Sequence, residues 1–189
     1  MKSREEAFAI LKKYNSSENL IRHALSVESV MRNFARHLNE DVEYWGIVGL
    51  LHDIDYEMYP EQHCKVAPKL LKENGFDDQF IHAVVSHGYQ ICCDVEPVLP
   101  MEKVLYTIDE LTGLITATAL MRPSRSLDDL KVKSVMKKWK TKGFSQGVDR
   151  DLILQGCSMI PMELSEVITL SIEGMRTIQQ QLGFNSLAG

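Results

Sequence analysis

Apolar residues recur at intervals of three and four positions along most of this 189-residue chain, and sustained two-residue alternation is nearly absent. Such spacing places apolar side chains on one face of an α-helix, whereas a half-buried strand requires alternation. The pattern therefore predicts an all-α protein. Its clearest case is the segment 18–38, whose apolar stripe is formed by Leu20, Ala24, Val27, Val30, Met31, Phe34 and Leu38.

Turn-forming residues divide the chain into further predicted helices. Asn74-Gly75 is a typical helix end, and Ser126 with Asp129 resembles a capping arrangement at a helix start. No repeat or linker interrupts the pattern, so we expect a single-domain multi-helix bundle over residues 1–189. The expected helices span 3–13, 18–38, 42–53, 61–73, 77–87, 101–120, 127–139, 148–158 and 161–182.

The composition is that of an ordinary globular protein, with 44% apolar and 25% charged residues. A net charge of −5 disfavours a general nucleic-acid surface. The charged first residues lack the apolar stretch of a signal peptide, and no window is apolar enough for a membrane span. Four cysteines without a C-x-x-C pair favour a reducing compartment. We expect a cytoplasmic location, and a homo-oligomer is compatible with these features.

His52 and Asp53 stand side by side after the apolar run Val48-Gly49-Leu50-Leu51. Burying both costs several kcal/mol unless each has a partner, and a divalent metal satisfies both. Other histidines and one aspartate fall at inward-facing helix positions, so that four imidazoles and two carboxylates would meet in one interior. Two divalent ions need about this many ligands. The six candidates are His23, His52, Asp53, His63, His87 and Asp109.

Taken singly, each candidate has an ordinary alternative. A lone histidine on an apolar face is more often a hydrogen-bonded core residue, and Asp109 could pair with a lysine. His37 lies near a helix end and His82 is at best a support for a ligand, so both are left out of the site. Six polar side chains at core positions without obvious private partners favour a shared cation.

The order of His23, His52-Asp53 and Asp109 resembles the HD superfamily of metal-dependent phosphohydrolases. The intervening His63 and His87 match the extra histidines of its two-metal branch. The resemblance covers about residues 18–120 and implies an HD metal-binding core there. The helices of residues 121–189 would then pack on that core.

Carried over by position, the resemblance implies a binuclear centre. His23, His52 and Asp109 would hold one metal, and His63 and His87 the second. Asp53 would bridge both ions and a hydroxide, as the catalytic carboxylate. A ligand set rich in histidine and free of thiols suits iron, manganese, cobalt, nickel or zinc better than calcium.

Several departures from relatives narrow the activity. Many relatives read His-Asp-Ile-Gly-Lys, but here Asp55 and Tyr56 take the last two positions. The single-metal nucleotidases and the alarmone hydrolases carry a glutamate where Tyr56 stands, so the sequence counts against both activities. No Gly-Tyr-Pro signature follows, which counts against the cyclic dinucleotide branch.

The resemblance thus implies hydrolysis of a phosphate ester or anhydride, with a small nucleotide as the favoured substrate and a metal-bridging hydroxide as the nucleophile. Arg122 and Arg125 are candidate substrate contacts in place of the missing lysine, or else solvent-exposed residues at a helix end. Cys92-Cys93 could border the cleft.

Three other functions stay open at this point. Some relatives use a similar ligand set in a di-iron oxygenase. A metal-stabilised sensor module without catalysis would need the same ligands. A helical interaction protein, in which the histidines only form hydrogen bonds, would need no metal.

Overall fold

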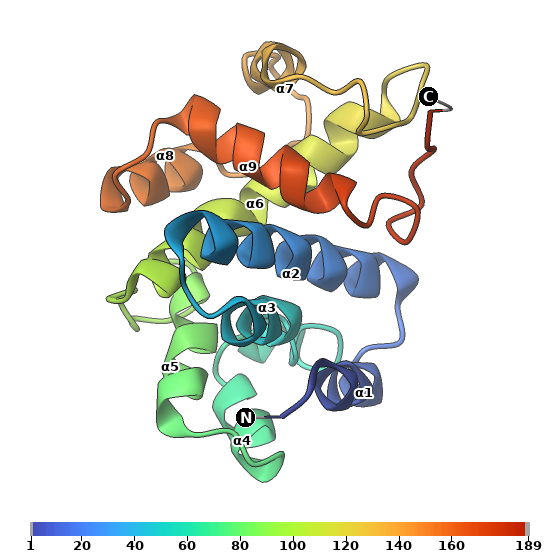
Figure 1. Ribbon diagram of the computed structural model, residues 1–189. Coiled ribbons are helices and arrows are strands. Elements are labelled where there is room, and N and C mark those ends of the chain that lie inside the picture. Colours follow the sequence, from blue (N-terminus) through green and yellow to red (C-terminus); the bar gives the residue numbers. More distant parts are fainter. Residues whose placement is uncertain (1, 188–189) are drawn as a thin grey trace.

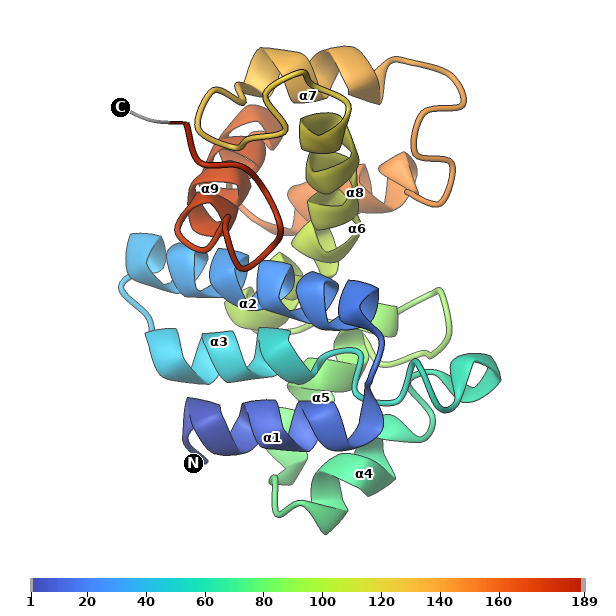
Figure 2. The same ribbon diagram turned by 90° about the vertical axis from the view of Figure 1, so that its right-hand side faces the viewer.

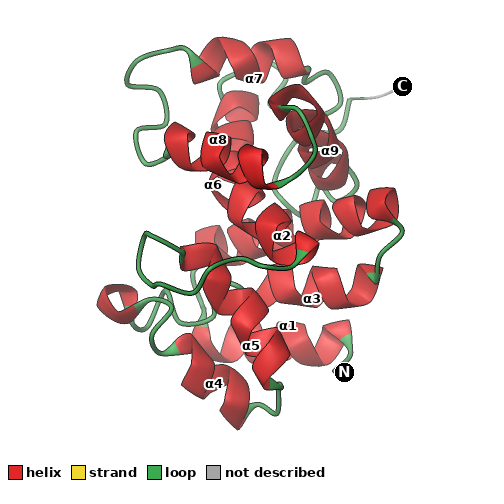
Figure 3. Cartoon of the chain, turned by 90° about the vertical axis from the view of Figure 1, so that its left-hand side faces the viewer, coloured by secondary structure: helices red, strands yellow, loops and turns green. Residues whose placement is uncertain are grey.

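The computed structural model describes residues 2–187, and every regular element of that range is a helix (Figures 1 and 3). The all-α prediction is confirmed. Residues 1, 188 and 189 of the expected domain lie outside the described range. The elements are α1 (Arg4–Tyr14), α2 (Glu18–Leu38), α3 (Val42–Leu51), η1 (Pro60–Gln62), α4 (Ala67–Glu73), α5 (Asp78–Val85), η2 (Ser86–Gly88), α6 (Pro100–Leu120), α7 (Val132–Trp139), α8 (Arg150–Met159) and α9 (Leu164–Arg176).

Helix α2 lies in the middle of the molecule (Figures 1 and 2). On one side of it lie α1, α3, α4 and α5, and on the other side lie α7, α8 and α9. The long helix α6 runs between the two sides. All residues of α3 from Trp45 to Leu51 are buried, because α1, α2 and α5 pack around that helix. An interior helix of this kind is apolar on every face.

The C-terminal helix α9 covers the face of α2 that α3 leaves free. A Cβ at Gly174 would lie 2.8 Å from the Ser29 carbonyl oxygen and 2.9 Å from Val30 Cα, so glycine allows the two backbones to approach this closely. Asn33 on α2 donates a hydrogen bond of 2.9 Å to the carbonyl of Leu170 on α9. The position of α2, and hence of His23, is therefore set from both sides of the molecule.

Two expected helices near the site have different boundaries in the structure. The helix expected over 42–53 ends at Leu51, although His52 keeps helical dihedral angles (φ −57°, ψ −40°). The helix expected over 61–73 is interrupted, because Cys64 adopts a left-handed conformation with φ 63°. The chain forms the short η1, turns at Cys64 and resumes as α4 at Ala67.

The helices predicted in the C-terminal part are present, but some of their boundaries differ from the prediction. The helix expected from 127 begins at Val132. Asp129 does not complete a capping box with Ser126, because its carboxylate accepts hydrogen bonds from Arg122 and Ser124. The helix expected over 161–182 is regular only from Leu164 to Arg176, and turns follow it as far as Gly183.

A search of the described residues finds no helix whose length and apolar character would suit a membrane crossing.

Candidate metal centre

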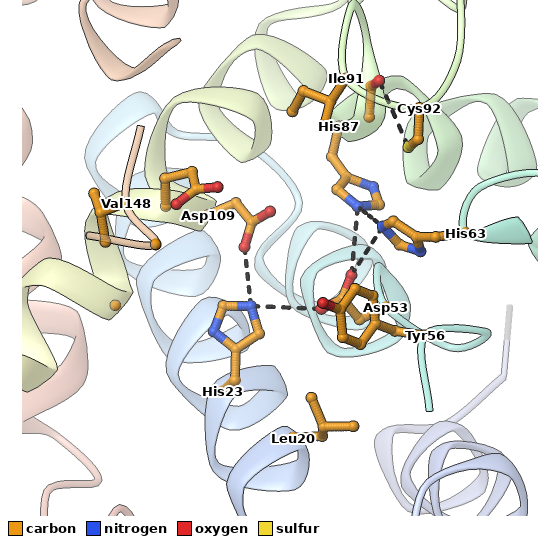
Figure 4. Close-up of a pocket in the computed structure, with 14 residues that line it drawn as sticks. Leu20, His23, Asp53, Tyr56, His63, His87, Ile91, Cys92, Asp109 and Val148 are labelled. Atoms are coloured by element: carbon orange, nitrogen blue, oxygen red, sulfur yellow. Dashed lines mark hydrogen bonds and ion pairs between the residues drawn. The ribbon is translucent and has the colours of Figure 1, made fainter. Parts of the chain in front are cut away.

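All six predicted side chains meet at one place: His23, Asp53, His63, His87 and Asp109 line a cavity of about 430 Å³ (Figure 4), and the buried His52 contacts His23 and Asp109. Helix α2 contributes His23, and α6 contributes Asp109. The turn after α3 contributes His52 and Asp53, since the chain leaves the helix at that point. His63 follows η1, and His87 lies within η2.

One half of the cluster consists of His23, His52 and Asp109. The Nε2 atoms of His23 and His52 are 3.2 Å apart. Asp109 Oδ1 lies 2.9 Å from His23 Nε2 and 3.3 Å from His52 Nε2. Three potential ligand atoms from three parts of the chain therefore face a common point.

The other half consists of His63 and His87, whose Nε2 atoms are 3.1 Å apart. His87 is held by a 2.6 Å hydrogen bond from Nδ1 to the carbonyl of Val84, one turn earlier. His63 is held by a 2.8 Å hydrogen bond from Nδ1 to the carboxylate of Asp55. Both rings thus present Nε2 to the cavity.

The carboxylate of Asp53 lies between the two halves and divides its oxygens between them (Figure 4). Oδ2 is 3.4 Å from His52 Nε2 and 3.6 Å from His23 Nε2. Oδ1 is 3.4 Å from both His63 Nε2 and His87 Nε2. Asp53 therefore directs one oxygen to each half, and a ligand atom of His52 also lies within 4.8 Å of one of His87.

The donor set fits metal ions. His52 Nδ1 donates to the Gly49 carbonyl at 2.8 Å, and the corresponding atoms of His63 and His87 also face acceptors. In the neutral form each of these rings therefore points the lone pair of Nε2 at other nitrogen lone pairs and at carboxylate oxygens. Lone pairs 3.1–3.4 Å apart repel each other unless positive charge lies between them. Metal–nitrogen bonds of about 2.0–2.1 Å accommodate such separations.

The ionisation of the cluster also reflects its need for positive charge. Burial alone would lower the pKa of His52, but the carboxylates of Asp53 and Asp109 outweigh burial and raise the pKa well above its usual value. Burial alone would raise the pKa of Asp53 and of Asp109, but the neighbouring His52 holds the pKa of both carboxyls well below the ordinary range. Both aspartates are therefore anionic at neutral pH, the form in which a carboxylate can bind a metal ion.

Asp55 is a functional residue that the sequence reasoning missed. It is completely buried, accepts a hydrogen bond from His63 through Oδ1, and accepts another from the backbone N–H of Ala67 through Oδ2. The same carboxylate thus orients a site histidine and caps the first turn of α4. A second acidic residue two positions after Asp53, in a buried run, was the available signal.

The wall of the cavity is acidic and apolar. Within residues 2–187, no lysine or arginine lines it. Leu20, Ile91 and Val148 form apolar parts of the wall, and Cys92 also reaches it. Glu110 lies beside Asp109, and its burial, together with the Asp109 charge, raises the pKa of that carboxyl to about 7.

A second cavity of about 350 Å³ adjoins the first, since His23 and Gly113 line both. Arg22 and the predicted Arg125 line the second cavity. Arg122 lines neither: its guanidinium is bound to Asp129, to the carbonyl of that residue and to Ser134. The structure therefore brings one of the two predicted arginines towards the site.

The two excluded histidines lie outside the cluster. His37 is 45% exposed and lies 3.9 Å from Glu166. His82 hydrogen-bonds Glu102, which also accepts hydrogen bonds from the backbone N–H groups of Val98 and Leu99. His82, on α5, therefore contacts the start of α6 and lies outside the cluster.

The geometry agrees with comparison to known families, in which the HD domain matches residues 20–123 of the chain. This match spans more than half of the sequence and contains all six clustered residues. The chain belongs to the HD domain family. That family consists in general of metal-dependent hydrolases, and the His/Asp groups described above could hold metal. Comparison with curated proteins and with solved structures gives no significant match.

Proposed function

We propose that this HD domain binds two divalent transition-metal ions and hydrolyses a small phosphorylated molecule, with a nucleotide as the favoured class. His23, His52 and Asp109 would hold one ion, and His63 and His87 the other. Asp53 would bridge them. The observation that carries the proposal is the division of the Asp53 oxygens, with Oδ2 facing one group of imidazoles and Oδ1 the other.

Two bound ions would supply a water of lowered pKa and would neutralise the charge of the reacting phosphate. The protein contributes the arrangement of the ligands. The Gly49 and Val84 carbonyls and the Asp55 carboxylate fix the three imidazoles in the tautomer that leaves Nε2 free. Because these partners are buried, the ligands are held in place before the substrate arrives.

The cavities support a substrate with an organic part and a second anionic group. Leu20, Ile91 and Val148 offer apolar contact to the organic part beside the metals. Arg22 and Arg125 in the adjoining cavity would hold a second anionic group at a greater distance from the metals. Within the described chain, no lysine or arginine lines the cavity at the metals. In this arrangement residues 18–120 form the metal-binding core. Residues 121–187 would cover it and complete the outer cavity.

The proposal is tested by metal analysis of anaerobically purified protein, followed by a panel of phosphate esters, nucleotides and dinucleoside polyphosphates with the same sample. We expect two metal ions per chain and release of phosphate or a nucleoside phosphate without oxygen uptake. Oxygen consumption with a metal-loaded sample would identify an oxygenase instead. Full metal loading without turnover of any substrate would identify a sensor.

A matched pair of variants tests the assignment of the bridge. Asp53→Ala should empty the centre and abolish turnover, because it removes the one carboxylate that both halves share. His37→Ala removes an exposed imidazole outside the cluster and should leave metal content and turnover nearly intact. Equal metal content and activity in the two variants would refute the assignment.

The role of Arg125 has its own measurement. Arg125→Ala should raise the KM of a substrate with a second anionic group by about tenfold, the loss of one charged hydrogen bond, and leave kcat nearly unchanged. The KM of p-nitrophenyl phosphate should not change, because this ester has no second anionic group for Arg125 to bind. An unchanged KM for both substrates would remove Arg125 from the substrate site.

A further inference from the structure

We propose that the His63 half of the centre is a mixed nitrogen–sulfur metal site, to which Cys64 and Cys92 contribute thiolate ligands. This inference rests on the proposed function, since it assumes that an ion binds between His63 and His87. It differs from the sequence expectation of thiol-free ligation. The class of ion that it favours is a borderline or soft divalent metal, such as zinc, iron(II) or cobalt(II).

The two sulfur atoms lie beside the imidazoles of this half, and the measured distance of Cys64 is within ligation range. One ligand atom each from His63, Cys64 and Cys92 forms a group in which all separations are at most 4.8 Å. Cys64 Sγ is 3.9 Å from His87 Nε2. An ion about 2.3 Å from sulfur and about 2.0–2.1 Å from nitrogen can join atoms up to about 4.4 Å apart. One ion can therefore contact both His87 and Cys64.

The backbone holds both thiols at this position. Cys64 has φ 63°, a left-handed conformation that a cysteine rarely adopts, and this turn buries its side chain to 3% exposure. Cys92 follows a tight turn in which its N–H, at 2.9 Å, and its thiol, at 3.7 Å, both donate to the Gly88 carbonyl, so that metal ligation would replace the hydrogen bond of the thiol. A Cβ at position 88 would collide with both sulfur atoms. The two thiols therefore lie against Gly88, directly after the ligand His87.

The other two cysteines do not share this arrangement, which makes them controls. Cys93 is next to Cys92 in sequence, but it belongs to none of the groups of potential ligands found within residues 2–187, and its thiol donates to the carbonyl of Val85 at 3.3 Å. Cys157 lies on α8 and belongs to none of the groups of potential ligands in the described residues. Adjacency in sequence therefore does not decide which thiol reaches the ion.

Ligation needs no oxidant. Each thiol that binds the ion loses one proton to solvent and forms one metal–sulfur bond, with no change in the oxidation state of sulfur or metal. The other half of the centre offers only nitrogen and oxygen ligands. The two halves should therefore differ in metal preference, with manganese or magnesium bound less well beside the thiols.

Titration of the metal-free full-length protein with cobalt(II), under anaerobic reducing conditions, tests the proposal. We expect an intense near-ultraviolet sulfur-to-cobalt charge-transfer band as the ions bind. Cys93→Ser and Cys157→Ser should keep the full band. Cys64→Ser and Cys92→Ser should each weaken it. The double variant C64S/C92S should lack it while still binding cobalt, because the nitrogen and oxygen ligands remain.

The outcomes separate this inference from the proposed function. Cobalt binding by the unaltered protein without a charge-transfer band would overturn the thiolate ligands and leave the binuclear centre standing. Absence of cobalt binding would overturn both. Thermal unfolding of the metal-free variants at the temperature of the unaltered protein confirms that they fold. A band that persists in the double variant and disappears in Cys93→Ser would also refute the assignment.

Discussion

The two halves of the centre are built in different ways. His23 and Asp109 project from the long helices α2 and α6, and His52 immediately follows the buried helix α3. His63 and His87 instead lie on short turns, and the first is held in place by the side chain of Asp55. Thiols lie beside the second half alone among the described groups of potential ligands. Asp53 thus joins a half carried by long, packed helices to a half carried by short segments, in which His63 depends on the side chain of Asp55.

The difference suggests that the metal ion of one half can be removed while the other ion stays bound. The first half depends on packing between helices, which a single substitution disturbs little. In the second half, one substitution can remove the hydrogen bond from His63 to the Asp55 side chain, whereas His87 donates to the backbone carbonyl of Val84. Three predictions test this comparison.

The largest effect is expected from removing one ligand in each half. His52→Ala should remove the ion of the first half, and His63→Ala the ion of the second, with the other ion retained in each case. Turnover should fall by about 10²–10³-fold or more in both, as for loss of a group that stabilises the transition state. Metal quantification and steady-state rates measure this. If either variant loses both ions, the two halves form one cooperative unit and the comparison is broken.

A smaller effect is expected from Asp55→Asn. The amide can still accept a hydrogen bond from His63 but carries no charge, and it cannot also accept one from the Ala67 N–H through its nitrogen. Affinity for the second ion should fall by about 10–100-fold, the usual cost of losing a partner behind a ligand. Competition with a chromophoric chelator measures each affinity. Thr112→Val, at a long 3.5 Å contact with His23, is the matched change in the first half and should have little effect.

The smallest effect is expected in the dependence of stability on pH. The pKa of His52 is raised well above about 6.5 in the folded protein by Asp53 and Asp109, which outweigh burial. In chelator, the protonated ring therefore stabilises the fold below about pH 6.5, and this stabilisation is lost as the pH rises through the raised pKa. The lowered pKa values of the two aspartates contribute above about pH 4 and are lost in stronger acid.

Bound metal should reverse the sign of the dependence of Tm on pH between pH 6 and 8, because the ligands must be deprotonated to bind it. We expect Tm in chelator to fall by several degrees over this range, and Tm with zinc to rise. Scanning calorimetry at three pH values in both conditions measures the two slopes. Slopes of equal sign would contradict the assignment of His52. His63 also has a raised pKa, through its hydrogen bond to Asp55 against the effect of burial, and His63→Ala should reduce the slope less than His52→Ala.

The type and order of the helices followed from periodicity, and the errors have local causes. The bounds of α2 and α6 were predicted to within one residue, because a long helix carries an apolar pattern over many turns that identifies it without its neighbours. Cys64 could not be placed, since its left-handed turn is imposed by the contacts around it. The prediction of Asp129 as a cap is wrong, because the loop between α6 and α7 folds so that Asp129 binds Arg122 instead.

The sequence by itself determined which imidazoles and carboxylates are candidates, since a polar group at a helical core position is conspicuous wherever that helix lies. Only the tertiary structure decided how Asp53 divides its oxygens, that Asp55 supports His63, and that Arg22 and two thiols lie near the clustered imidazoles. These residues sit on turns or on partly exposed faces, where periodicity carries no signal. The residues that contact them are determined by how segments far apart along the chain pack together. The sequence alone does not give the distance between such segments.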